Sequence, residues 1–153
     1  MLPKYHILFG LLFSYILIYF FNFSIISGII IFLSSVLIDA DHYFYFVFKK
    51  KNISLKNAFN FFTNIRKKYI ALPKKEKRKY STPIFIFHGI EFILILIFLS
   101  FVNKFFLWIL IGVLFHLIFD LAELIYTKGI FLTKISQIYV MIRNKNKKSF
   151  KIK

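Results

Sequence analysis

The chain has 153 residues, a formal net charge of +16 and no cysteine, and 59% of its residues are hydrophobic. Soluble domains average roughly 45–50% apolar residues, so this composition favours a membrane protein. The missing cysteines exclude disulfides and thiolate metal ligands. In a soluble protein such a charge would suggest nucleic acid, but in a membrane protein it first indicates topology and contact with anionic lipid.

Four apolar segments follow one another along the chain, at about 5–21, 23–48, 83–102 and 105–126. Each approaches or exceeds the ~20 residues that a bilayer-spanning helix needs, and backbone groups in hydrocarbon must bond within the segment. We therefore expect an all-α membrane protein, a four-transmembrane-helix bundle that forms one domain over 1–153. The pair Thr82-Pro83 is expected to cap and open the third helix.

The basic residues predict the orientation of these helices. Twelve of the 22 lie between Lys49 and Lys79 and eight lie from Lys128 to Lys153, which leaves only Lys4 and Lys104 elsewhere. Cytoplasmic loops carry the excess of lysine and arginine. The loop 49–82, the tail 127–153 and both termini are therefore expected to be cytoplasmic, in a multi-pass protein of the cell membrane.

The loop 49–82 contains the stretch ISLKNAFNFFTNIRKKYIAL, in which apolar and basic residues alternate at roughly helical spacing. Such a stretch predicts an amphipathic helix on the cytoplasmic leaflet, in contact with anionic headgroups. The tail contains a similar stretch. A simpler interpretation is a charged anchor that only fixes orientation. No basic fold typical of nucleic-acid binding is present, so membrane lipids are the expected partners and the oligomeric state stays open.

Every histidine and five of the six acidic residues lie in or at the ends of the apolar segments. They are His6 in the first segment; Asp39, Asp41 and His42 in the second; His88 and Glu91 in the third; and His116, Asp120 and Glu123 in the fourth. Several are spaced i, i+3 or i, i+4, which places two side chains on one face of a helix. At 1.5 Å per residue, those of the second, third and fourth segments are expected at similar depths on the cytoplasmic side, with His6 shallower.

These groups predict a metal site. An ionised carboxylate within a membrane costs at least ~2.5–3.5 kcal/mol, and a divalent cation would supply the missing charge. Carboxylate and imidazole ligands suit zinc, which we expect, or manganese or iron. Helix-borne carboxylate–histidine pairs that face a bundle interior can build a dinuclear site. Two alternatives stay open: a proton or ion relay from the same groups, and a packing role for a lone histidine such as His6.

The order of these motifs resembles that of the YdjM-like inner-membrane metal-dependent hydrolases, which are similar in their His/Asp pattern to the zinc-dependent phospholipase C superfamily. The resemblance rests on an early histidine, a helix that ends in DADH (39–42), a histidine in the next segment, and HLIFD (116–120) in the last. It implies metal-site positions at His6, Asp39, Asp41, His42, His88, His116 and Asp120. Many such proteins carry a histidine–arginine pair ahead of the third-segment histidine. Here STPIFIFHGIE has no second histidine and no arginine, and Glu91 is the expected replacement ligand.

We therefore expect a membrane-embedded metal-dependent hydrolase that acts on a phosphoester or lipid-type substrate at the cytoplasmic face. Bound cations would polarise a phosphoryl or acyl oxygen, and Asp41 or Glu91 would act as general base. No serine nucleophile elbow, P-loop or Rossmann fingerprint is present. The main alternative is a non-enzymatic membrane protein, either a metal or proton transporter or a structural factor, and a redox di-metal oxidase is a third option. A transporter needs a polar path across the membrane, and this is disfavoured because the outer halves of the segments are almost wholly apolar.

Overall fold

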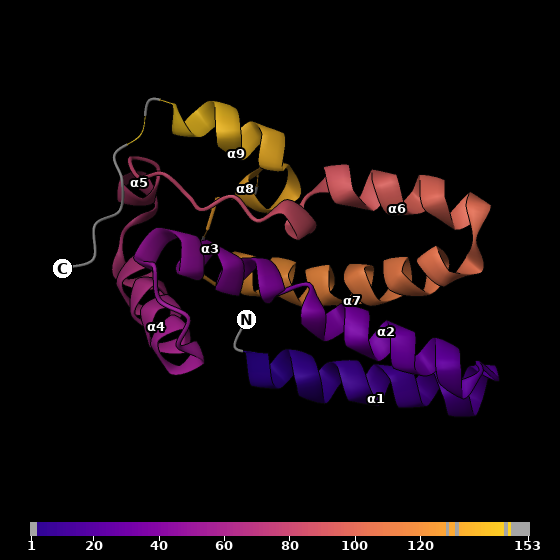
Figure 1. Ribbon diagram of the computed structural model, residues 1–153. Coiled ribbons are helices and arrows are strands. Elements are labelled where there is room, and N and C mark those ends of the chain that lie inside the picture. Colours follow the sequence, from indigo (N-terminus) through magenta and orange to yellow (C-terminus); the bar gives the residue numbers. More distant parts are fainter. Residues whose placement is uncertain (1–2, 128, 131, 146, 148–153) are drawn as a thin grey trace. The chain divides into compact units, whose positions relative to one another are not determined.

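The computed structural model of the chain describes residues 3–127, 129–130, 132–145 and 147, and every regular element among them is helical (Figure 1). The last six residues of the predicted basic tail lie outside this part. The elements are α1 (Pro3–Phe21), α2 (Ile25–Leu37), α3 (Ala40–Lys50), α4 (Leu55–Ala71), α5 (Lys74–Lys77), the 3-10 helix η1 (Ile86–His88), α6 (Ile90–Val102), α7 (Lys104–Tyr126), α8 (Leu132–Ile135) and α9 (Gln137–Asn144).

Three helical stretches of the described chain are long and apolar enough to cross a membrane: Lys4–Phe21, Ile25–Lys50 and Lys104–Tyr126. The protein is therefore helical with the character of a membrane protein, as the composition predicts. The fourth apolar helix, α6, has only 13 residues. At 1.5 Å per residue it is about 20 Å long, which is shorter than a hydrocarbon core of about 30 Å.

The second apolar segment is not one continuous helix, as 23–48 predicted. α2 ends at Leu37, and a turn at Ile38 and Asp39 precedes α3. The N–H of Asp39 donates to the carbonyl of Val36, three residues earlier, whereas an α-helix bonds to the carbonyl four residues earlier. Short acidic side chains favour turns and helix starts over helix interiors, and Asp41 then lies in the first turn of α3, where a negative charge is favourable. The break separates Asp39 from the helix that bears Asp41.

The third apolar segment begins its helix seven residues later than predicted. Residues 83–85 have no regular structure, η1 follows, and Gly89 is extended before α6 begins at Ile90. The expected helix start at Thr82-Pro83 is therefore wrong. The reason lies far away in the sequence: side chains of α9 bond the backbone of Thr82 and Phe85, which removes these residues from helix formation.

The chain divides into two compact units. The first unit comprises Met1–Asp39 and Ile90–Glu123, and the second comprises Ala40–Gly89 and Leu124–Lys153. By sequence, 20 of the 22 basic residues fall in the second unit, whereas four of the six acidic residues fall in the first. The acidic and basic characters of the chain therefore belong to different units.

In the first unit, α1 lies beside α2 (Figure 1). The hydroxyl of Ser14 on α1 donates to the carbonyl of Gly28 on α2 at 2.5 Å, so a small residue on each helix allows close approach. α1 also contacts α7 through stacked rings. Phe13 stacks on Phe115 with centroids 4.0 Å apart, and a second pair, Phe9 and Phe119, lies at 4.9 Å.

α7 packs closely against α2 at Gly112. A Cβ atom at this position would collide with the Ser34 hydroxyl and with the backbone carbonyl of Ile31. The two helices therefore meet backbone to backbone, which only glycine permits. Ser35 and His116, described below, lie next to this contact, one residue after Ser34 and one turn after Gly112.

In the second unit, the loop predicted to be an amphipathic helix forms α4, which begins after the N-cap Ser54. Phe61 of α4 packs on Phe46 of α3 with ring centroids 5.4 Å apart, and Ala58 is buried. α9 begins after a second serine cap, Ser136. Its side chains hold the irregular segment that precedes η1.

Candidate metal centre

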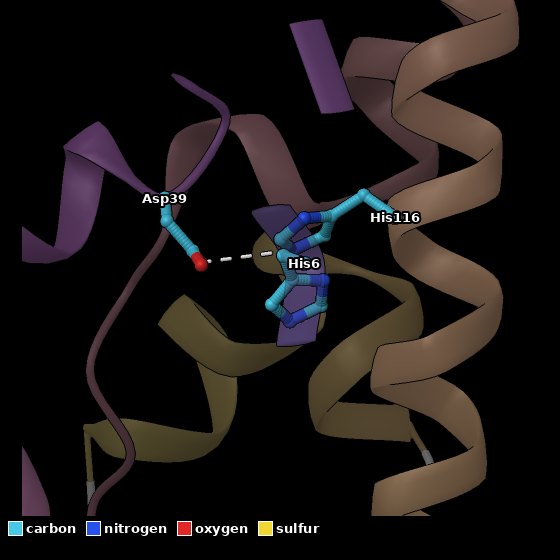
Figure 2. Close-up of side chains that lie close together, drawn as sticks. All are labelled: His6, Asp39 and His116. Carbon is cyan, nitrogen blue, oxygen red and sulfur yellow. Dashed lines mark ion pairs between the residues drawn. The ribbon is translucent and has the colours of Figure 1, made fainter. Parts of the chain in front are cut away.

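Three side chains of the first unit bring possible ligand atoms together (Figure 2). His6 comes from α1, Asp39 from the turn after α2, and His116 from α7. One ligand atom of each lies within 4.8 Å of the other two. His6 and His116 are 4% and 1% exposed, so both imidazoles are withdrawn from solvent. The three residues lie 33 and 77 positions apart in the sequence, and only the fold collects them.

The orientation of His116 is set by one hydrogen bond. Its Nδ1 lies 2.8 Å from the carbonyl oxygen of Ser35. A carbonyl can only accept, so Nδ1 carries the hydrogen and donates it. In the neutral imidazole, Nε2 is then the nitrogen with the lone pair. A metal-binding histidine usually has its other ring nitrogen bonded in this way.

Two carboxylates face that nitrogen. His116 Nε2 lies 3.6 Å from Oδ1 of Asp39 and 3.8 Å from Oδ2 of Asp120, which is one turn further along α7. The i, i+4 pair of His116 and Asp120 on one helix therefore forms as predicted. Asp120 is 3% exposed, so its charge is deeply buried among apolar helices.

His6 also lies close to Asp120. Its Nε2 lies 3.6 Å from Oδ1 of Asp120, and its ring stacks on that of His116 with centroids 3.9 Å apart. This nitrogen is buried and has no hydrogen-bond partner among the described residues. A buried polar atom without a partner requires an explanation, and a cation shared with Asp120 and His116 provides one.

The distances themselves favour a cation over direct hydrogen bonds. The separations of 3.6–3.8 Å between imidazole nitrogens and carboxylate oxygens exceed the usual 2.7–3.2 Å of a hydrogen bond. Two ligands that bind one zinc ion tetrahedrally at about 2.0–2.1 Å lie roughly 3.3 Å apart. Small adjustments would thus bring these atoms to coordination distance. Two imidazoles and two carboxylates could hold a divalent ion and would balance its charge.

The second unit contains a separate cluster around Asp41. Oδ1 of Asp41 lies 2.8 Å from Nδ1 of His42, and Oδ2 lies 3.0 Å from Nδ1 of His88. The backbone N–H of Phe87 donates to Oδ2 as well, at 3.3 Å. An ionised carboxylate only accepts, so both imidazoles donate through Nδ1, and in their neutral form the lone pair is on Nε2. Carboxylates commonly orient metal-binding histidines in this way.

Aromatic rings fix His42 within this cluster. Its ring stacks on Phe85 with centroids 3.7 Å apart and meets the edge of His88 at 4.9 Å. Phe62 of α4 lies edge-on to the same imidazole at 5.4 Å. His42 is thus held on two sides by carbon rings and on a third by Asp41.

Two of the expected pairs do not lie on one helix. His88 and Glu91 were expected on one helix face, but His88 belongs to η1 and Glu91 to the first turn of α6, with the extended Gly89 between them. Asp39 likewise lies in the turn after α2, whereas His42 lies in α3. Glu91 and Glu123 belong to none of the histidine and carboxylate groups that could hold a metal among the described residues.

Sequence reasoning missed the groups that orient the histidines. The Ser35 carbonyl that holds His116 is a backbone atom, which no residue pattern reveals. The stacking of His6 on His116 also depends on the approach of α1 to α7. Phe85 gave no signal, because one phenylalanine among 23 is not distinctive.

Comparison of the chain with protein-family models, with curated proteins and with solved structures finds no match.

The first testable consequence concerns bound metal. Replacing His116 with alanine removes the nitrogen that faces both carboxylates. It should lower the affinity for a divalent ion by at least the roughly 10–100-fold that loss of an outer-shell partner costs. Elemental analysis and metal titration of the purified protein in detergent would measure this.

The control for this experiment is Glu76→Gln. Glu76 lies in α5, in an exposed ion pair with Lys79 at 2.6 Å, whose hydrogen bond raises the pKa of Lys79. Exposed ion pairs contribute only about 0–1 kcal/mol, so this variant should keep its metal. Equal metal content in both variants would contradict a centre at His116.

Proposed function

We propose that the chain is a membrane-embedded metal-dependent hydrolase that acts on a phosphoester or lipid-type substrate at the cytoplasmic face. The observation that supports it best is the convergence of His6, Asp39 and His116 from three separate elements, with Asp120 beside both imidazoles. Buried imidazole–carboxylate sets of this kind are suited to metal-assisted hydrolysis. The surrounding helices are apolar, so a substrate with a lipid portion fits such a site best.

The residues of the first unit would hold the ion, which we propose to be zinc. When bound, it would act as a Lewis acid on a phosphoryl or acyl oxygen and lower the pKa of a water to about 7. Asp39 and Asp120 would supply the negative charge, while His6 and His116 would bind as neutral imidazoles. The Ser35 carbonyl keeps His116 in the required tautomer.

Asp41 and Glu91 were the two candidates for the general base. Asp41 accepts hydrogen bonds from three donors, which favours a role in orienting His42 and His88. Glu91 therefore remains the proposed base. The His/Asp order that resembles the YdjM-like hydrolases agrees with this function, and we propose membership of that family on those motifs alone.

A second function is supported by the same geometry. If His116 carried a second proton, its Nε2–H would point toward Asp39 and Asp120, and the set would resemble a proton relay without a metal. Buried histidine–carboxylate chains serve this purpose in pumps and transporters. Bound metal distinguishes the two functions, because the relay needs none.

Hydrolysis should be detectable on a panel of phosphoesters with soluble and lipid leaving groups. We expect turnover by the purified protein that a chelator abolishes and added zinc restores. His116→Ala should lower kcat/KM by at least about 10²-fold, since the charge stabilisation that the ion supplies amounts to several kcal/mol. A protein that binds metal but hydrolyses no member of the panel would contradict the hydrolase and favour a transport or structural role. A protein that holds no metal under any condition would favour the relay.

We also propose that both termini and the loop 49–82 are cytoplasmic and that the protein resides in the cell membrane. The distribution of basic residues supports this through the positive-inside rule. It requires α6, together with the residues before it, to cross the bilayer despite its length. A bilayer can thin locally around a short span at modest cost.

Cysteine labelling from outside the cell tests this topology, because the natural chain has no cysteine. A cysteine at Asn103, between α6 and α7, should react with an impermeant reagent, whereas one at Lys75 in α5 should not. A silent Asn103 together with a reactive position in the tail would show that α6 does not cross.

Anionic lipids are the proposed partners of the second unit. Exposed apolar side chains on α4 and α9 accompany its many basic residues: Leu55, Phe59, Ile138, Met141 and Ile142. Basic amphipathic helices of this kind bind anionic membranes. A synthetic peptide of residues 53–72 should become helical on anionic vesicles and dissociate as salt rises. A peptide that stays unfolded and unbound at low salt would contradict this partner.

A further inference from the structure

The segment that leads to His88 is held by side chains of α9. The backbone N–H of Phe85 donates to Oε1 of Gln137 at 2.9 Å. Asn144 bonds Thr82 twice, with Oδ1 accepting from its N–H at 3.1 Å and Nδ2 donating to its carbonyl at 2.7 Å. These contacts replace the helical bonds that the segment lacks, and all lie within the second unit.

Phe85 connects Gln137 to both histidines of the Asp41 cluster. Its ring stacks on His42 with centroids 3.7 Å apart and an interplanar angle of 16°. Its carbonyl accepts a hydrogen bond from the N–H of His88 at 3.0 Å. A displacement of the Phe85 backbone would therefore move the face against which His42 packs and the turn that carries His88.

Gln137 is suited to holding this position firmly. It is 8% exposed, and it is the first residue of α9, directly after the N-cap Ser136, whose hydroxyl accepts from the N–H of Tyr139. The bond is part-buried, and an N–H that loses its acceptor in such a place is destabilised. Without the Gln137 oxygen, Phe85 would therefore move to satisfy its N–H elsewhere.

We propose that Gln137 is a positioning residue for the Asp41–His42–His88 cluster and acts through Phe85. It bonds the Phe85 backbone, and it thereby sets how both imidazoles are oriented. Its importance for activity rests on the proposed function, whereas its effect on the two rings does not.

Histidine NMR of the full-length protein in detergent would test this, with 13C-labelled imidazoles. A stacked phenyl ring shifts the ring protons of His42 upfield. Gln137→Met keeps the length of the side chain and removes the acceptor, so the upfield shift of His42 should be lost and the His88 signal should move. His6 and His116 in the first unit should keep their signals. His42→Gln and Phe85→Leu identify the His42 resonance and the source of its shift.

Gln137→Glu is the matched control, because a carboxylate oxygen can accept the same N–H. It should preserve the His42 and His88 signals, and Ile138→Ala, which alters only an exposed side chain of α9, should preserve them too. Signals that stay in place in folded Gln137→Met would overturn the proposal. Equal displacement of the His42 and His88 signals in Gln137→Glu and Gln137→Met would also overturn it, because the acceptor would then not matter. This comparison decides the question if the methionine variant folds poorly.

Activity provides the second readout. If His42 and His88 also take part in the proposed hydrolysis, Gln137→Met should cause a loss of chelator-sensitive turnover, and Gln137→Glu should restore most of it. If the natural chain shows no such hydrolysis while Gln137→Met still displaces the His42 signal, the positioning role holds and the hydrolase proposal fails. Full hydrolysis in Gln137→Met would overturn the link between Gln137 and activity.

Discussion

The hydrogen bond from His116 Nδ1 to the Ser35 carbonyl is the contact on which the chemistry of the first unit depends. It determines which ring nitrogen bears the hydrogen, and therefore whether Nε2 can bind a cation between Asp39 and Asp120. Without it, the imidazole could turn and donate to one of these carboxylates, forming an ordinary buried ion pair. A single main-chain acceptor thus decides whether His116 could bind a metal or would only form a hydrogen bond with a carboxylate.

The two histidine clusters differ in the kind of group that orients the imidazoles. In the first unit, a backbone carbonyl orients His116, and the carboxylates are left to face its other nitrogen. In the second unit, the carboxylate of Asp41 does the orienting, and it accepts from His42, His88 and a backbone N–H. The DADH motif therefore contains two acids with different surroundings. Asp39 lies in a turn as one of the candidate metal ligands, and Asp41 lies in the first turn of α3 as a hydrogen-bond acceptor.

The sequence predicts the long apolar helices well, because α1 and α7 depend only on local hydrophobicity and length. The His116–Asp120 pair follows from helical spacing for the same reason. The sequence fails where distant side chains compete with the helix for backbone groups, as Gln137 and Asn144 do at Thr82 and Phe85. The position of the break between α2 and α3 could be suspected from two aspartates in an apolar run. The tautomer of His116 and the stacking of His6 depend on tertiary packing that no spacing encodes.

The close approach at Gly112 has a consequence for how firmly the centre is defined. There α7 rests on the main chain of α2 at Ile31 and on the Ser34 hydroxyl, with no room for an intervening side chain. Ser35 follows Ser34 directly, and His116 lies one turn beyond Gly112. The distance from the His116 imidazole to the Ser35 carbonyl is therefore set by contact between two helical backbones. Backbones are stiff, whereas side chains can change rotamer. A contact between two stiff backbones changes little with side-chain motion, so we expect the His116 imidazole to keep its orientation when the surrounding side chains fluctuate.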